Sequence, residues 1–218
     1  MNPKLPCPRP GRTVLEGRYA RLEPLAASHA EGLLAASVDA RSFDYLFDVP
    51  PKGSQDILAW IAKNAASEDL MVHAVVDKRT GVSGGRQSYM RIEPTNGVIE
   101  IGNILWGPAI ARTRVATEAL YLSAKHVFED LGYRRYEWKC NDLNVPSKAA
   151  AKRFGFRYEG VFRQHMWVKG ANRDTAWFAM IDKDWPRIRA AYERWLAPEN
   201  FDASGRQRAK LQVPTSAA

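Results

Sequence analysis

The stretch EIGNILWGPAIARTRVATEA, residues 100–119, contains the clearest change of pattern in the chain. Its first half belongs to an alternating run over residues 98–106, which is typical of a β-strand. After Pro108 the apolar residues recur at helical spacing. We therefore expect a strand that leaves a sheet through a short loop and continues into a helix over about residues 116–131.

The start of this helix is suited to binding an anion. Unpaired backbone N–H groups and the positive end of the helix dipole meet there. Arg112 and Arg114 add positive charge in the preceding loop. An ordinary strand-to-helix turn with solvated arginines explains the same residues, so the pattern alone leaves both interpretations open.

Short apolar runs bounded by turn residues predict further elements on both sides of this unit. Strands are expected at residues 19–23, 72–76, 82–92, 98–106, 135–140, 156–162 and 175–181. Helices are expected at residues 28–37, from 54, at 116–131, at 147–153 and from 186, with Ser28 and Ser54 as caps of the first two. Consecutive strands joined by short glycine-containing turns predict an antiparallel meander, and the fold class is α/β or α+β, a sheet layered with helices.

Composition and charge limit the classes of protein. The 218 residues include 45% apolar residues, and 32 Lys and Arg against 24 Asp and Glu give a formal charge of +8. This balance excludes a disordered, collagen-like or coiled-coil chain, and it favours an anionic partner such as nucleic acid, acidic lipid or a phosphorylated cofactor. Residues 1–12 are interpreted as a Pro-rich N-terminal arm, 13–198 as a single domain and 199–218 as a polar basic tail.

The cysteines and the hydropathy pattern bear on the compartment. Cys7 and Cys140 are the two cysteines, and they supply neither a disulfide framework nor a CxxC metal motif. No segment approaches the apolar length of a spanning helix, and the proline-rich beginning lacks the apolar core of a secretory signal. We therefore expect a cytoplasmic protein with no membrane partner.

A second group of polar residues, Asn144-Val145-Pro146-Ser147, lies between a predicted strand and a short helix. Asn144 and the Ser147 hydroxyl should lie close together there. Ser147 is suited to be the N-cap of the helix, and capping alone would explain its presence.

The order of these pieces resembles the GNAT superfamily of N-acetyltransferases, especially the branch of ribosomal-protein N-terminal alanine and serine acetyltransferases. The resemblance extends from Tyr19 to Pro186. It is carried by Glu100-Ile101-Gly102, Ala116-Thr117-Glu118-Ala119, Asn144-x-x-Ser147, Gly155-Phe156-x-x-Glu159-Gly160-x-x-Arg163 and Arg173-Asp174-Thr175-Ala176-Trp177-Phe178. It implies a mostly antiparallel central sheet flanked by helices and transfer of an acetyl group from acetyl-CoA to a primary amine of a small molecule, a peptide or a protein N-terminus.

The resemblance also implies a coenzyme site. In that family the loop before the long helix reads Gln/Arg-x-x-Gly-x-Gly/Ala and holds the pyrophosphate of acetyl-CoA. Here Ala111 replaces the Gln/Arg, Arg114 the central Gly and Ala116 the final residue. A side chain at the central position restricts the backbone, so we expect Arg112 and Arg114 to compensate by their charge. The coenzyme-binding residues implied are Leu105, Trp106, Ala111, Arg112, Thr113, Arg114, Val115, Ala116, Thr117, Asn144 and Ser147.

Amine acetylation needs a group that takes a proton from the amine and a proton source for the departing sulfur. Glu100 is the candidate base, with a structural ion pair as its alternative role, and Ser147 is the candidate proton donor. Neither cysteine falls in a motif for a covalent intermediate, so direct attack in a ternary complex is expected. The residues that resemble the acceptor walls of the family are Phe43, Tyr45, Phe47, Arg163 and His165. No pair of histidines has ligand spacing, so no metal is expected.

Two other functions fit parts of the sequence. A catalytically silent relative that binds CoA would explain the missing glycine. A nucleic-acid-binding module would use the +8 charge and the basic tail, although the basic residues are dispersed and form no recognisable motif. The partner expected for the enzyme is an amine-bearing small molecule or peptide, with no nucleic acid required, and a homodimer is left open.

Overall fold

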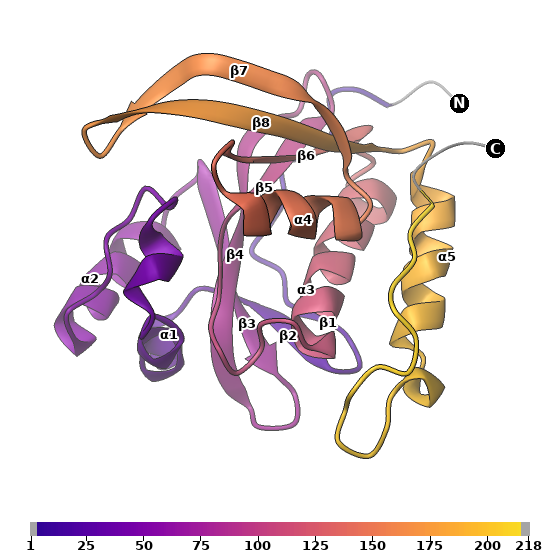
Figure 1. Ribbon diagram of the computed structural model, residues 1–218, viewed down its shortest axis with the longest axis horizontal. Helices are drawn as coiled ribbons and strands as arrows, with labels where there is room; N and C mark the ends of the chain where they lie inside the picture. The colour runs from indigo at the N-terminus through magenta and orange to yellow at the C-terminus, as the bar shows by residue number, and fades with distance from the viewer. Residues whose placement is uncertain (1–3, 215–218) are drawn as a thin grey trace.

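Residues 4–214 are described by the computed structural model, and their eight strands form one sheet in the order β1-β2-β3-β4-β5-β6-β8-β7 (Figure 1). The strands are β1 (Leu15–Glu16), β2 (Ala20–Pro24), β3 (Leu70–Asp77), β4 (Val82–Glu93), β5 (Val98–Trp106), β6 (Arg135–Asn141), β7 (Arg157–Val168) and β8 (Ala171–Ile181). The helices are α1 (Ala30–Ala36), α2 (Ser54–Ala65), α3 (Arg114–Lys125), α4 (Val145–Arg153) and α5 (Trp185–Leu196), with 3-10 turns η1 (Ala27–His29), η2 (Ala40–Phe43) and η4 (Pro198–Asn200) and a π-helical turn η3 (His126–Asp130). The expected mixed α/β fold with a mostly antiparallel sheet is confirmed.

One pair of neighbours in this sheet runs parallel. β5 pairs in parallel with β6, whereas the other adjacent strands pair antiparallel. Parallel neighbours cannot be joined by a tight turn and need a crossover connection. Here α3 and η3 form that crossover, and the beginning of α3 therefore lies near the end of β5.

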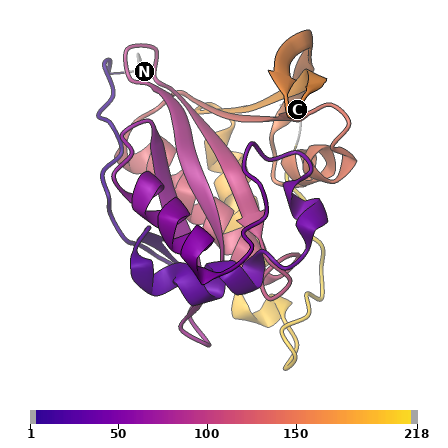
Figure 2. The same ribbon diagram turned by 90° about the vertical axis from the view of Figure 1, so that its left-hand side faces the viewer.

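Helices cover both faces of the sheet. α1 and α2 lie on one face, where Leu33, Ile57 and Val72 belong to a small core, and Figure 2 shows these two helices in front of the strands. α3 and α5 lie on the other face and share the main core with the sheet, through residues such as Leu120 and Tyr192. The site described below lies at the edge of this main core.

The first two helices begin differently from the prediction. Ser28 lies inside η1, and the backbone N–H of Ala26 donates to His29 Nδ1 at 3.1 Å. Gly53 precedes α2, with no side-chain cap from Ser54. The predicted serine caps are wrong, because His29 accepts the hydrogen bond at the first helix start and Ser54 is already the first residue of α2, where Asp56 accepts from the preceding Lys52 N–H at 2.8 Å.

The hairpin of β7 and β8 is longer than predicted. The two strands extend to Val168 and from Ala171, with a turn in which Lys169 has φ 51° and Gly170 has φ 76°. Register shifts between Tyr158 and Gly160 and between Phe162 and Met166 interrupt the alternation of side chains. Because the alternation is interrupted, the sequence pattern did not predict the outer half of the hairpin, residues 163–174.

Both end segments lie on the domain. The Cys7 side chain is buried, and its backbone N–H donates to Pro94 O at 2.9 Å. In the segment predicted to be a tail, Phe201 is buried and forms a β-bridge with Gln207, and Trp195 Nε1 donates to the Gln207 side chain at 3.0 Å. Over residues 199–214 the segment is therefore part of the folded unit, and residues 1–3 and 215–218 of the predicted ends lie outside the described residues.

Within residues 4–214, no helix combines the length and the apolar character that crossing a membrane requires.

Glu118 fixes α3 to the start of β2. Its side chain is buried, and its carboxylate accepts three backbone N–H groups, from Arg18 at 2.9 Å, Tyr19 at 2.5 Å and Ala20 at 2.6 Å. Hydrogen bonds to a charged acceptor are stronger than neutral ones, and leaving a buried donor unpaired is costly. This carboxylate therefore has a structural role.

We expect Glu118→Gln to lower the free energy of unfolding by about 2 kcal/mol, because an amide replaces one acceptor oxygen by a donor facing other donors. Urea unfolding measures this change. Glu31→Gln, at an exposed position of α1, is the control and should change stability by less than about 0.5 kcal/mol. Equal stability of the two variants would contradict the structural role of Glu118.

Candidate active site

The parallel strands β5 and β6 separate along their length. Their pairing covers Val98 to Ile101 on β5 and Arg135 to Trp138 on β6 and then stops, although β5 continues to Trp106 and β6 to Asn141. The facing backbone edges beyond this point are free of each other. A cavity of about 630 Å³ lies at this opening, lined by β4, β5, β6, α4, the start of α3 and the loop after η2.

A bulge on β5 widens the opening. Arg86 pairs with Leu105 and Ser88 with Gly102, so β5 has one residue more than β4 between these pairs. Asn103 takes up the extra length with φ 50° and lines the cavity. The bulge turns this part of β5 away from regular sheet geometry next to Leu105 and Trp106, where the sequence placed coenzyme contacts.

The loop before α3 carries a cluster of free donors. Thr113 is the N-cap, and its hydroxyl oxygen accepts from the Val115 N–H at 3.2 Å. Among residues 4–214, the N–H groups of Arg112, Arg114 and Ala116 have no hydrogen-bond partner. Such a set of N–H groups at a helix start is suited to phosphate oxygens.

The two arginines of this loop have different roles. Arg112 adopts φ 61° and lines the cavity. The backbone of Arg114 is already helical, and its guanidinium lies over the Tyr19 ring at 4.3 Å and the Phe201 ring at 5.2 Å. The predicted use of the Arg114 side chain for an anion is therefore not supported by its position, because two aromatic faces hold it on the side of the C-terminal segment.

The other residues of this loop and helix start also divide into those that line the cavity and those that do not. Ala111, Ala116 and Thr117 line the cavity, whereas Val115 is buried in the main core. Arg153 on α4, which the sequence did not indicate, also lines the cavity and donates to Thr117 Oγ1 at 3.3 Å. A second guanidinium thus stands beside the free N–H groups in place of that of Arg114.

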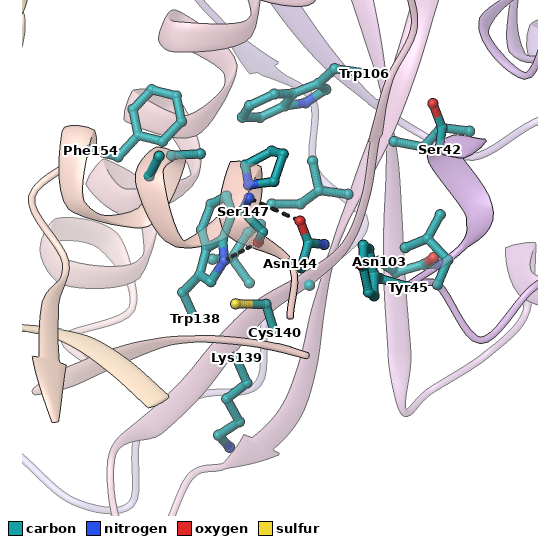
Figure 3. A pocket seen from close by; sticks show the side chains of 18 of the residues that line it. Ser42, Tyr45, Asn103, Trp106, Trp138, Lys139, Cys140, Asn144, Ser147 and Phe154 are labelled. Carbon is teal, nitrogen blue, oxygen red and sulfur yellow. Dashed lines mark hydrogen bonds between the residues drawn. The ribbon is translucent and has the colours of Figure 1, made fainter. Parts of the chain in front are cut away.

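Asn144, and not Ser147, caps α4. The Asn144 side-chain oxygen accepts from the Ser147 N–H at 3.0 Å, and the Ser147 hydroxyl accepts from Trp138 Nε1 at 3.0 Å. Figure 3 shows these three side chains meeting at the start of α4, with the thiol of Cys140 beside them. The predicted capping role of Ser147 is wrong, and its hydroxyl is available to the cavity.

The Cys140 thiol stays protonated near neutral pH because burial raises its pKa above the ordinary value of 9.0, against smaller opposing effects of the Ser147 hydroxyl and the charge of Arg173. A protonated buried thiol is a poor nucleophile.

Glu100 is held between two cations. Its side chain is 3% exposed, and its oxygens lie 2.8 Å from Arg91 Nη1 and 2.9 Å from Lys139 Nζ. Lys139 also pairs with Glu137 at 2.6 Å and lies over the Trp177 ring at 3.9 Å. The alternative of a structural ion pair for Glu100 matches these contacts.

The residues expected to wall the acceptor are brought together only in part. Tyr45 and Phe47 line the cavity, whereas Phe43 is buried beside a second cavity of about 440 Å³ next to α2. Arg163 is exposed and His165 bonds to Thr175 Oγ1 at 3.0 Å, and neither lines the main cavity.

Arg163 lies in the part of β7 that is out of register with β8 between Phe162 and Met166, and Arg173 on β8, which pairs with Met166, lines the cavity instead. The tip of the same hairpin fixes the loop after η2, because Lys169 Nζ donates to Phe43 O and Asp48 O at 2.8 Å each.

Several lining residues were not predicted. They are Ser42, Met90, Arg91, Asn103, Trp138, Lys139, Cys140, Arg153, Phe154, Arg173 and Gln207, among others. Alternation along residues 135–141 indicates which of them share a face, but the strand partners that bring them to the cavity are set by long-range register. Among residues 4–214, no cluster of three or more His, Cys, Asp or Glu side chains is arranged to hold a metal ion.

Comparisons with known proteins agree with this geometry. Residues 20–157 match the family model of the acetyltransferase (GNAT) domain, and the chain belongs to this family. A crystal structure of a GCN5-related N-acetyltransferase from Brucella melitensis is 53% identical, with a TM-score of 0.92 over 95% of this chain and 96% of that one. A protein from Chromobacterium violaceum ATCC 12472 that is assigned to the GNAT family is 37% identical, with a TM-score of 0.77 over 83% and 91% of the two chains.

A ribosomal L7/L12 α-N-protein acetyltransferase has the same fold at 19% identity, with a TM-score of 0.67 over 78% of this chain and 94% of that one. A comparison with curated proteins found no match. The family assignment defines the chain as an acetyl-CoA-dependent acetyltransferase that acts on an amine.

Breaking the Glu100 ion pairs should destabilise the domain. We expect Glu100→Gln to lower the free energy of unfolding by about 3 kcal/mol, because it leaves Arg91 without a carboxylate and Lys139 with one in place of two. Glu159→Gln, which alters an ion pair with Arg135 whose glutamate is 42% exposed, is the control and should cost below about 1 kcal/mol. Urea unfolding of both variants tests the difference, and an unchanged Glu100→Gln midpoint would refute it.

Proposed function

We propose that the cavity between β5 and β6 binds acetyl-CoA with its phosphates at the start of α3, and that the acetyl group passes directly to a primary amine. The observation that carries the proposal is the separation of β5 from β6 at a point where one wall ends in free helix N–H groups. Arg112 and Arg153 supply charge at the same end of the cavity. The coenzyme supplies the acetyl thioester.

The loop fits a phosphate although it lacks the glycine of the family pattern. The positive φ that the turn requires falls on Arg112, and the helix begins at Arg114 with ordinary dihedrals. The side chain at the central position therefore points away from the cavity and leaves the backbone N–H groups accessible. This geometry supports coenzyme binding in spite of the substitution, and acetyl transfer itself distinguishes the enzyme from a catalytically silent relative that binds CoA.

The other site residues are assigned by what they face. Leu105 and Trp106 lie directly after the β5 bulge and line the cavity, and we assign an N–H of this segment to polarise the carbonyl oxygen. Asn144 keeps α4 in position, and the Ser147 hydroxyl, oriented by the Trp138 N–H, donates a proton toward the sulfur as the C–S bond breaks. The amine nitrogen loses one proton and the sulfur gains one, so the reaction balances.

Direct attack is favoured over a covalent enzyme intermediate. Cys140 lines the cavity, but burial raises its pKa and keeps the thiol protonated. Glu100 is assigned to hold Arg91 and Lys139 in place, and water is assigned to take the amine proton. The acceptor is a primary amine on a small molecule or at a peptide N-terminus.

Loss of either cavity arginine should weaken binding of the phosphorylated coenzyme. We expect Arg112→Gln and Arg153→Gln each to raise the Kd for CoA about tenfold and to leave the Kd for pantetheine, which has no phosphate, unchanged. Isothermal titration calorimetry measures both. Lys152→Gln is the control, since Lys152 is the neighbour of Arg153 on α4 and does not line the cavity. Equal losses for CoA and pantetheine would contradict phosphate binding at this end.

Two variants distinguish the role of the Ser147 hydroxyl from that of the Trp138 N–H that orients it. We expect Ser147→Ala to lower kcat about tenfold with little change in the Kd for CoA, because the proton donor to sulfur is lost while Asn144 still caps α4. Trp138→Phe removes the N–H that orients the hydroxyl but keeps the hydroxyl, so its loss of kcat should be smaller. Release of free CoA with a panel of amines provides the rate, and an unchanged kcat in Ser147→Ala would exclude the assignment.

A further inference from the structure

Arg173 on β8 is a buried cation without a counter-charge. The residue is 7% exposed and lines the main cavity, and its Nε has no hydrogen-bond partner. Among residues 4–214 its guanidinium forms no ion pair and donates no hydrogen bond. The Phe47 ring, at 5.0 Å, covers one side of the guanidinium, and its remaining N–H groups are left for a ligand.

Arg86 is a buried arginine with a structural role, and it provides a comparison for Arg173. Its side chain is 4% exposed, and it pairs with Asp48 at 2.7 Å and lies over the Trp60 ring at 3.9 Å. Arg173 has the aromatic contact but not the carboxylate. A buried charge without a partner costs free energy unless a ligand supplies the partner.

The neighbouring charges do not provide this partner. Glu100 is occupied by Arg91 and Lys139, and Glu137 by Lys139 and Arg135. The acidic and basic side chains near Arg173 are therefore paired with one another, and Arg173 is left without a carboxylate.

Positive side chains of the cavity wall act on the ring of His165, which lies outside the cavity itself. Burial lowers the pKa of His165 below its usual value of 6.5, and the charges of Arg91 and Arg173 lower it further, which keeps the ring neutral at pH 7. The carboxylate whose charge acts on Arg173 is that of Glu100, and it is already paired with Arg91 and Lys139.

Arg173 stands apart from the end of the cavity assigned to the coenzyme phosphates. It lies against Phe47 of the loop after η2, and its neighbour Asp174 accepts a backbone hydrogen bond from Asp142 at 2.9 Å, at the end of β6 that follows Cys140. Arg112 and Arg153 lie at the start of α3 instead. A ligand bound to Arg173 would therefore be next to the proposed site of transfer, on the acceptor side.

We propose that Arg173 binds a carboxylate of the acceptor, so that the substrate class is an amine that carries a carboxylate close to its nitrogen. This inference rests on the proposed function of the same cavity. The planar guanidinium matches a carboxylate in a bidentate manner, and burial strengthens the pair because water does not compete. The carboxylate belongs either to a free amino acid or to an acidic residue at a peptide N-terminus.

Matched acceptors test the proposal on the wild-type protein. One arm compares free amino acids with their carboxamides, and the other compares peptides that begin with Asp or Glu with the same peptides beginning with Asn or Gln. We expect kcat/KM to be about tenfold to a hundredfold higher for the carboxylate member in one of the arms, mainly through KM. Ratios within twofold in both arms, or a preference for the amides, would overturn the proposal.

Variants connect the preference to Arg173. In Arg173→Gln the ratio should fall to about one because carboxylate acceptors lose activity and amides do not, and Arg173→Lys, which keeps the charge but not the fork, should be intermediate. Arg157→Gln removes one charge from an exposed position of β7 in the same hairpin and should keep the wild-type ratio. A ratio that persists in Arg173→Gln would refute the role of this residue, and if this variant fails to fold, Arg173→Lys and the wild-type ratios still decide.

Failure of this inference differs from failure of the proposed function. Acetyl transfer to amines without a carboxylate preference refutes only the role of Arg173. Absence of both CoA binding and acetyl transfer refutes the proposed function. If CoA binds but no acceptor in the panel is turned over, the Kd of each carboxylate and amide acceptor for the CoA-loaded protein is measured by titration. A carboxylate acceptor that binds no more tightly than its amide would overturn the inference.

Discussion

The parallel pairing of β5 with β6 is the constraint on which the site depends. Parallel neighbours require a crossover, and this crossover brings the start of α3 to the end of β5. The pairing also stops at Ile101, so the two strands open into a cavity at that same end. An antiparallel hairpin at this position would provide neither the gap nor the helix N-terminus. The ion pairs of Glu100 with Arg91 and Lys139 span the last paired positions and hold three strands together where the opening begins.

Much of the fold could be predicted because its information is local. Period-two and helical spacing located the central strands and all five helices, and the strand-loop-helix unit at residues 98–131 marked the site. The errors fall where side chains distant in sequence replace a local signal. His29 satisfies the first helix start in place of Ser28, and bulges interrupt the alternation of β7. The C-terminal segment is held by its contacts with Trp195 and Tyr19, which its composition does not reveal.

The sequence predicted the site residues that lie in contiguous segments, but not those that tertiary contacts bring to the cavity. Ala111 to Thr117 and Asn144 to Ser147 are contiguous, and both segments contribute to the cavity wall. The direction of Arg114 depends on two aromatic rings, from Tyr19 just before β2 and from Phe201 in the C-terminal segment, and the place of Arg173 depends on the long-range pairing of β8 with β6 and β7. Such choices are made by tertiary packing and pairing, and no spacing in the sequence encodes them.

The C-terminal segment contributes one residue to the cavity wall. Phe201 lies against Tyr19 at 5.6 Å between ring centroids, and Gln207 reaches the cavity wall. The C-terminal segment is thus held near the start of β2 by this ring contact and adds Gln207 to the cavity wall. The sheet, α3 and α4 alone therefore leave the cavity wall incomplete, and a change that released the C-terminal segment would open this wall without removing any residue of the sheet.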